Sequence, residues 1–158
     1  MAPILPEPRR RTRIWALALA LLFLAGLAAL TLTPARVEAR LPNLLDLALA
    51  AAHRLGWQSL DFTRIEILAN VLVFVPVGVL AFLLVPRRVW ALSLLVGPAA
   101  SLAIETAQRL LLPHRAATVS DVLANSAGAT IGVVLAVLCT AAAGALSAAR
   151  RSSRLEAL

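Results

Sequence analysis

Acidic and amide side chains interrupt the most apolar part of this chain, between residues 101 and 132. Such groups are costly in hydrocarbon, so inside membrane segments they mark functional sites or contacts between helices. The carboxyl groups of Glu105 and Asp121 are candidate catalytic groups, because two carboxyls in different surroundings can divide the roles of acid and base. The candidate ligand-binding residues around them are Asn70, Ser101, Gln108, Arg115 and Asn125.

Helical spacing sorts these residues into stripes, because side chains three or four positions apart share one face of a helix. In each of three apolar segments the polar and small residues form a single stripe, and the other faces of the helix are expected to contact lipid. Asn70, Phe74 and Gly78 form the first stripe and Ser101, Glu105 and Gln108 the second, and the third holds Asp121, Asn125, Gly128 and Gly132.

The glycines predict close approach of helices. Gly128 and Gly132 form a GxxxG pattern, which suits tight packing within one chain or across a dimer, and Gly78 has the matching small side chain on the first stripe. The pattern does not indicate nucleotide binding. No metal-ligand spacing and no cofactor motif accompanies it, so we expect neither a metal nor a cofactor.

The amino-acid composition indicates a membrane protein. The chain has 158 residues, is 61% hydrophobic and only 15% charged, and its mean hydropathy is +0.88. A soluble domain of this size needs more polar surface, so we expect an integral membrane protein with one compact domain. All fifteen basic residues are arginines that flank apolar runs, which argues against nucleic acid as a partner and for charges that set membrane topology.

The apolar runs predict an all-α, polytopic membrane protein with four transmembrane helices. An amphipathic interfacial helix, capped by Asn43 and stopped by Gly56, is expected between the first two spans. We expect residues 1–13 to be a disordered cytoplasmic tail, 14–148 the membrane domain and 149–158 a second cytoplasmic tail. A cleaved signal peptide is the alternative for the first span, but its length favours an anchor. The spans run over residues 14–33, 67–85, 89–112 and 120–146.

Arginine distribution orients the expected bundle. With four spans, both tails and the 86–88 turn share one side and hold most of the arginines, so the positive-inside rule makes both termini cytoplasmic. In this topology the polar residues of three spans meet in the outer half of the bilayer. They form either a hydrogen-bond network that holds the bundle together or a ligand or catalytic site, and the sequence leaves both open.

Three motifs in order resemble the VanZ-like family of small bacterial membrane proteins. They are Asn70-x-x-x-Phe74-x-Pro76-x-Gly78, then Ser101-x-x-Ile104-Glu105-x-x-Gln108, then Arg115 and Ser120-Asp121-x-x-x-Asn125-x-x-Gly128-Ala129-x-x-Gly132. The resemblance covers residues 66–132 best. It implies a cell-envelope role in a bacterial inner or plasma membrane, because the founding member is associated with resistance to the glycopeptide teicoplanin, but it supplies no reaction.

Three functions follow as hypotheses. The preferred one is an envelope protein that acts at the outer face, with the lipid bilayer and a glycopeptide or lipid-linked cell-wall precursor as partners. The second is a membrane enzyme on a lipid-linked or cell-wall substrate, with Glu105 and Asp121 as its acid and base. The third is a non-catalytic subunit, which could form an oligomer, packed through the face of Gly128 and Gly132.

Overall fold

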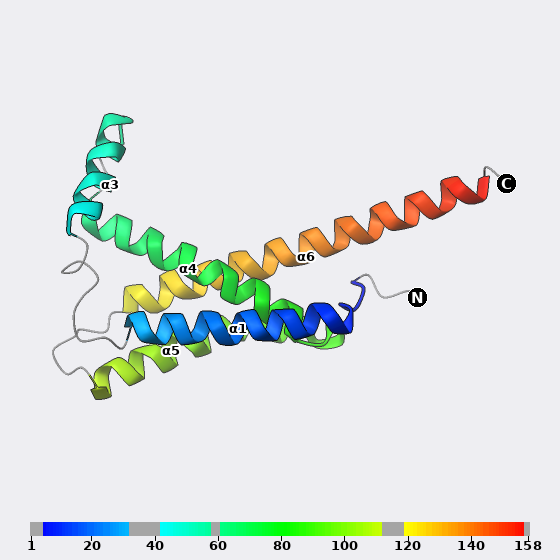
Figure 1. Cartoon of the computed structure of the whole chain (residues 1–158), viewed down its shortest axis with the longest axis horizontal. Coiled ribbons are helices and arrows are strands. Elements are labelled where there is room, and N and C mark those ends of the chain that lie inside the picture. The colour runs from blue at the N-terminus through cyan, green and yellow to red at the C-terminus, as the bar shows by residue number, and fades with distance from the viewer. Residues whose placement is uncertain (1–4, 32–41, 58–60, 112–118, 157–158) are drawn as a thin grey trace.

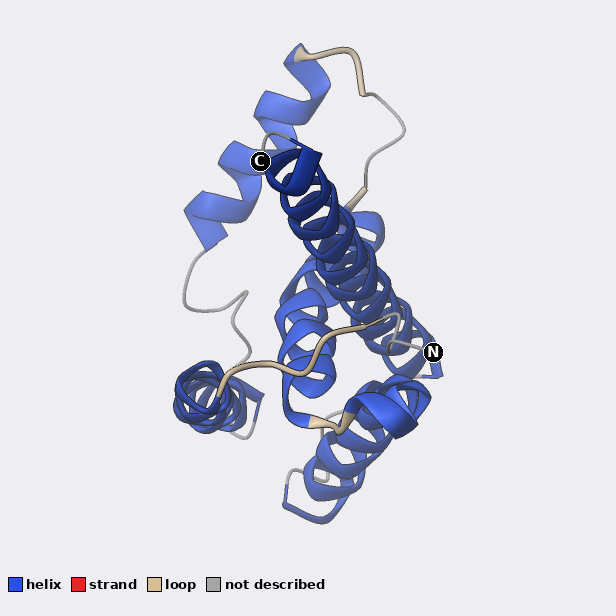
Figure 2. Cartoon of the chain, turned by 90° about the vertical axis from the view of Figure 1, so that its right-hand side faces the viewer, coloured by secondary structure: helices blue, strands red, loops and turns tan. Residues whose placement is uncertain are grey.

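The computed structural model describes residues 5–31, 42–57, 61–111 and 119–156. Within these ranges all regular structure is helical and no strand occurs (Figure 2). The elements in chain order are α1 (Arg10–Thr31), α3 (Pro42–Arg54), α4 (Phe62–Leu84), the 3-10 helix η1 (Arg87–Leu92), α5 (Ser93–Leu111) and α6 (Val119–Glu156).

Four helical segments of the described chain are long and apolar enough to cross a membrane. This confirms the prediction of an all-α protein with four transmembrane helices. The third span begins differently from the expected run, because η1 precedes α5 and the two together form one apolar segment. The candidate spans are Arg10–Ala29, Thr63–Leu84, Arg87–Leu111 and Val119–Arg150.

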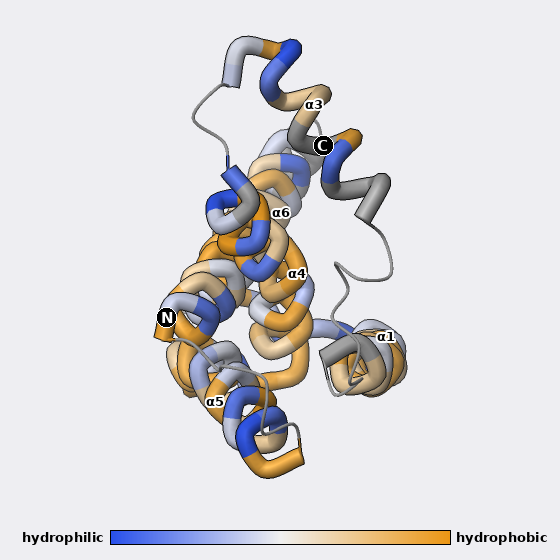
Figure 3. The backbone as a smooth tube through the Cα atoms, turned by 90° about the vertical axis from the view of Figure 1, so that its left-hand side faces the viewer, coloured by the Kyte–Doolittle hydropathy of each residue, from blue (hydrophilic) through white to orange (hydrophobic). Residues whose placement is uncertain are grey.

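The bundle is built around the crossing of α4 and α6. α5 packs against both of them, whereas α1 packs mainly on α4 (Figure 1). α1 buries few of its side chains, among them Ala16 and Leu27, and exposes large apolar ones such as Leu22. Figure 3 shows α1 set to one side of the other helices. In a bilayer these exposed faces of α1 meet lipid.

α3 lies beyond the end of the bundle, close to the start of α4 (Figure 1). It begins at Pro42, one residue before the Asn43 that the sequence suggested as its cap. Proline suits the first helical position because its missing N–H would have no partner there. At the other end, Gly56 has a φ of +86° and the Trp57 N–H donates to Ala52 O at 3.0 Å. This left-handed glycine ends the helix as expected. An interfacial position for α3 stays a prediction.

The helices reach further into both tails than the sequence suggested. α1 begins at Arg10, and α6 continues to Glu156. At a rise of about 1.5 Å per residue, α6 is longer than a hydrocarbon core about 30 Å thick. The last turns of α6 therefore extend past the rest of the bundle, as Figure 1 shows.

One carboxylate joins the start of the chain to the α4–η1 turn. Glu7 Oε2 lies 2.7 Å from the Arg13 guanidinium, and Glu7 Oε1 accepts a hydrogen bond of 2.9 Å from the Arg87 backbone N–H. Arg87 is buried; its side chain donates to Pro6 O and Phe82 O, and its guanidinium carbon stands 3.7 Å from the centroid of the Phe82 ring. We call this contact set the Glu7 bridge, and the end of the bundle that holds it the arginine end.

The Glu7 bridge predicts a local change in the variant Glu7→Ala. An exposed ion pair contributes about 0–1 kcal/mol, so global stability should hardly move. Backbone amides of residues 9–13 should nevertheless exchange with deuterium faster, because the chain before α1 loses its attachment to Arg87. Hydrogen-exchange mass spectrometry in detergent measures this, with Asp46→Ala on exposed α3 as the control. Unchanged exchange in Glu7→Ala contradicts the role given to the bridge.

Candidate functional site

The first polar contact of the site joins α4 to α6. Asn70 Nδ2 donates a hydrogen bond of 3.0 Å to Asp121 Oδ1, across 51 positions of sequence. Asp121 lies in the first turn of α6, where the positive end of the helix dipole favours a carboxylate. Both side chains are half-buried. The pair therefore fixes the α4–α6 crossing while part of the carboxylate stays accessible.

The second polar contact joins α5 to α6 one turn deeper. Asn125 Nδ2 donates a hydrogen bond of 2.9 Å to Ser101 Oγ, and both side chains are buried. The Asn125 carbonyl oxygen, Oδ1, is also buried, and it accepts no hydrogen bond from the residues that the structure describes. A buried acceptor without a donor costs about 1–3 kcal/mol. Asn125 Oδ1 is thus a buried acceptor whose desolvation cost is not offset by a hydrogen bond from the described residues.

α5 turns one continuous polar and small stripe inward. Its buried residues include Glu105 and Gln108, each only 6% exposed. Ser93 and Gly97 extend this stripe beyond the three residues predicted from the sequence. They precede Ser101 by eight and four positions and so continue its helical spacing. The buried residues of α5 are Ser93, Gly97, Ser101, Glu105 and Gln108.

The two candidate catalytic carboxyls lie at the same level of the bundle. α5 and α6 run in opposite directions (Figure 1), and the Ser101–Asn125 hydrogen bond sets their register. Glu105 follows Ser101 by one turn and Asp121 precedes Asn125 by one turn, so both shift toward the same end of the bundle. We call Asn70, Ser101, Glu105, Gln108, Asp121 and Asn125 the polar cluster, and the end of the bundle nearest to it the polar end. Arg115, the remaining candidate ligand, lies outside the described residues.

Glycines let the helices that carry the cluster touch backbone to backbone. A Cβ atom on Gly128 would overlap Val71 O, one on Gly132 would overlap Val75 O, and one on Gly78 would overlap Ala129 O. The GxxxG face of α6 is therefore occupied by α4 within the same chain. This close approach brings Asn70 within hydrogen-bond distance of Asp121.

A protein-family model matches most of the chain. Residues 14–140 match the family model described as VanZ/LLP1. The chain belongs to the VanZ/LLP1 family. This confirms the resemblance drawn from the motifs, and the match also takes in the first span, which contains none of the three motifs. No curated protein and no solved structure matches the chain. Every residue of the polar cluster lies inside the matched part of this VanZ-family protein.

Proposed function

We propose that this VanZ-family protein acts in the cell envelope by binding a polar group of an envelope molecule in the polar cluster. The observation that carries the proposal is the buried Asn125 Oδ1, an acceptor that lacks a donor among the described residues. A ligand hydroxyl or amide placed there would offset that desolvation cost. The neighbouring Asn70–Asp121 pair would bind a second polar group of the same ligand.

Arginine distribution supports action at the outer face. The first residues of α1 and the last residues of α6 lie at the same end of the molecule in Figure 1, and exposed arginines gather there, including Arg9, Arg10, Arg88 and Arg150. The positive-inside rule places that end in the cytoplasm. The polar cluster then lies in the outer half of the membrane, where a glycopeptide or its cell-wall target is within reach.

The test is a resistance measurement. Expression of the gene in a glycopeptide-sensitive bacterium should raise the teicoplanin concentration that stops growth, and should change the amount of labelled teicoplanin bound to the cell surface. A variant of equal expression with Asn125→Leu, which keeps the branched shape of the side chain but removes both its acceptor and its donor to Ser101 Oγ, should return both values to those of the empty vector. Unchanged susceptibility and unchanged surface binding on expression of the unaltered protein would reject the proposal.

An enzyme acting on a lipid-linked or cell-wall substrate is the second candidate function. The observation in its favour is that the two candidate catalytic carboxyls, at one level of the bundle, differ in how deeply they are buried. Glu105 is buried in the α5 stripe, whereas Asp121 is half-buried in the first turn of α6. Such a contrast suits one proton donor and one proton acceptor. A scaffold role through Gly128 and Gly132 has less support, because α4 already covers these glycines.

A further inference from the structure

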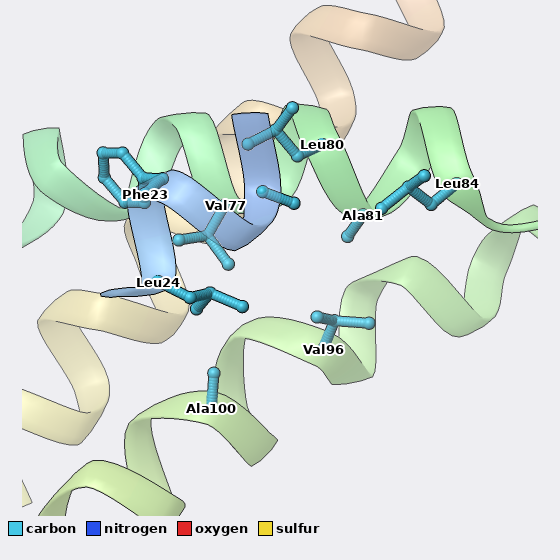
Figure 4. A pocket seen from close by; sticks show the side chains of 9 residues that line it. Phe23, Leu24, Val77, Leu80, Ala81, Leu84, Val96 and Ala100 are labelled. Atoms are coloured by element: carbon cyan, nitrogen blue, oxygen red, sulfur yellow. The ribbon is translucent and has the colours of Figure 1, made fainter. Parts of the chain in front are cut away.

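An apolar pocket lies between α1, α4 and α5, and no residue of the polar cluster lines it. Its volume is about 130 Å³, and Figure 4 shows side chains from all three helices pointing into it. Every lining residue is apolar. The lining comprises Ala20, Phe23 and Leu24 of α1, Val77, Leu80, Ala81 and Leu84 of α4, and Val96 and Ala100 of α5.

The pocket is continuous with the surface that faces lipid. Two of its lining residues are also exposed on the outside of the bundle, Leu24 by 44% and Val96 by 38%. α1 makes few contacts with α5, so the seam between these helices is the side entrance. Within the hydrocarbon core the molecules available at that entrance are lipids, and an empty apolar space forfeits dispersion contacts that a hydrocarbon chain restores.

The position of the pocket along the bundle indicates the head group. Leu84 is the last residue of α4, and Val96 lies in the first turn of α5. Figure 4 shows Leu84 where α4 gives way to the turn that leads to α5. The pocket thus occupies the half of the bundle next to the arginine end. Along α4 the nearest residue of the polar cluster, Asn70, lies about two helical turns beyond Val77. Along α5, Ser101 directly follows Ala100, but its hydroxyl is bonded to Asn125 of α6.

The arginine end offers cations to a lipid phosphate. Arg9, Arg10, Arg11 and Arg88 are exposed there. Arg13 and Arg87 are instead held by Glu7 and Pro6. Guanidinium groups bind phosphate through charge-assisted hydrogen bonds, and basic residues at the membrane surface attract anionic lipids. The charge at this end therefore complements an anionic head group above an apolar pocket.

We propose that an anionic phospholipid occupies this place, with one acyl chain in the pocket between α1, α4 and α5 and its phosphate at the exposed arginines. The bound lipid fills the seam beside α1 and holds α1 against the rest of the bundle. This site is separate from the polar cluster and does not depend on the function proposed for it.

The experiment is photo-crosslinking of the full chain in lipid nanodiscs. One preparation contains phosphatidylglycerol with a diazirine in its acyl chain, and the other contains phosphatidylcholine with the same chain. Phosphatidylglycerol should label peptides with residues 77–84 or 96–100 about five-fold more than phosphatidylcholine does. Equal labelling by the two lipids, or labelling spread evenly over the exposed helices, would overturn the proposal.

Matched variants separate the chain pocket from the head-group contact. Ala100→Phe fills the pocket, whereas Ala99→Phe places the same side chain on the exposed face of α5. Only the first should abolish the preference for phosphatidylglycerol. Ala20→Leu narrows the pocket from α1 and provides a second test if Ala100→Phe fails to fold. Labelling by phosphatidylglycerol that is unchanged in Ala20→Leu, or equal in the two phenylalanine variants, rejects the pocket.

The arginine contact has its own pair of variants. Arg88→Gln removes a charge at the arginine end, and Arg109→Gln removes one from an exposed position near the far end of α5. Labelling by phosphatidylglycerol should fall about five-fold in the first variant and stay level in the second. If labelling by phosphatidylglycerol falls equally in both variants, general surface charge explains the labelling and the site is rejected.

Discussion

The variant Gly132→Ala will lose about 3 kcal/mol of stability, whereas Gly144→Ala on the same helix will lose none. The added Cβ at residue 132 would overlap Val75 O, and a backbone carbonyl inside a helix cannot turn aside. At residue 144 the nearest atom is Pro6 Cδ at 3.8 Å, an ordinary contact distance. Alanine also favours the helix over glycine, so the Gly144 variant should be neutral or slightly more stable.

The measurement is reversible unfolding in mixed micelles, with Gly26→Ala as a second control because its Cβ would meet nothing within 4 Å. The variant Gly128→Ala, whose added Cβ would overlap Val71 O, should lose as much stability as Gly132→Ala. If Gly132→Ala unfolds with the same free energy as Gly144→Ala, the backbone contact between α4 and α6 is not as close as described.

The second large effect is on function, in the variants Asp121→Asn and Glu105→Gln. Each change removes a carboxyl group and keeps the size of the side chain. In Asp121→Asn the new amide oxygen can still accept from Asn70 Nδ2, so the α4–α6 contact should survive. Teicoplanin susceptibility should return to that of the empty vector. If the carboxyls act as acid and base, the rate of the reaction should fall about 100-fold or more.

Asp46→Asn is the matched control, because it removes the same charge from an exposed position on α3. It should leave both function and stability unchanged. Loss of function in Asp121→Asn with normal insertion and unfolding supports a site. Loss of folding in both cluster variants would instead show that the polar cluster holds the helices together, the alternative that polar groups in membranes often serve.

The sequence predicted most of the bundle because a bilayer imposes simple rules. Apolar runs of sufficient length become spans, and a polar residue inside a span turns away from lipid. Asn70 and Asp121 belong to the first and the third motif, yet spacing and topology placed them at one level, and the structure joins them by a hydrogen bond. The inward face of α5 followed from the same spacing.

The contacts that escaped prediction have no periodic signal. Glu7 stands in a polar segment before the first span, and its partner Arg87 follows 80 positions later. Nothing in either neighbourhood indicates the other. Gly97 continues the helical spacing of the α5 stripe, but that spacing does not indicate its partner, which is Ala129: a Cβ on Gly97 would overlap the Cβ of Ala129. Such contacts depend on how the helices cross, which local spacing does not determine.

The long sequence separation of the Asn70–Asp121 pair sets an order for assembly in the cell. Asn70 enters the membrane with α4, but its acceptor is synthesised 51 residues later. Until α6 arrives, the Asn70 amide needs another partner, because an unsatisfied polar group in hydrocarbon is costly. Ser101 likewise enters the membrane with α5, before its partner Asn125 in α6 is synthesised. Insertion of α6 is therefore the step that completes the bundle, and a chain truncated before α6 exposes its polar stripes to lipid and to the quality-control proteases of the membrane.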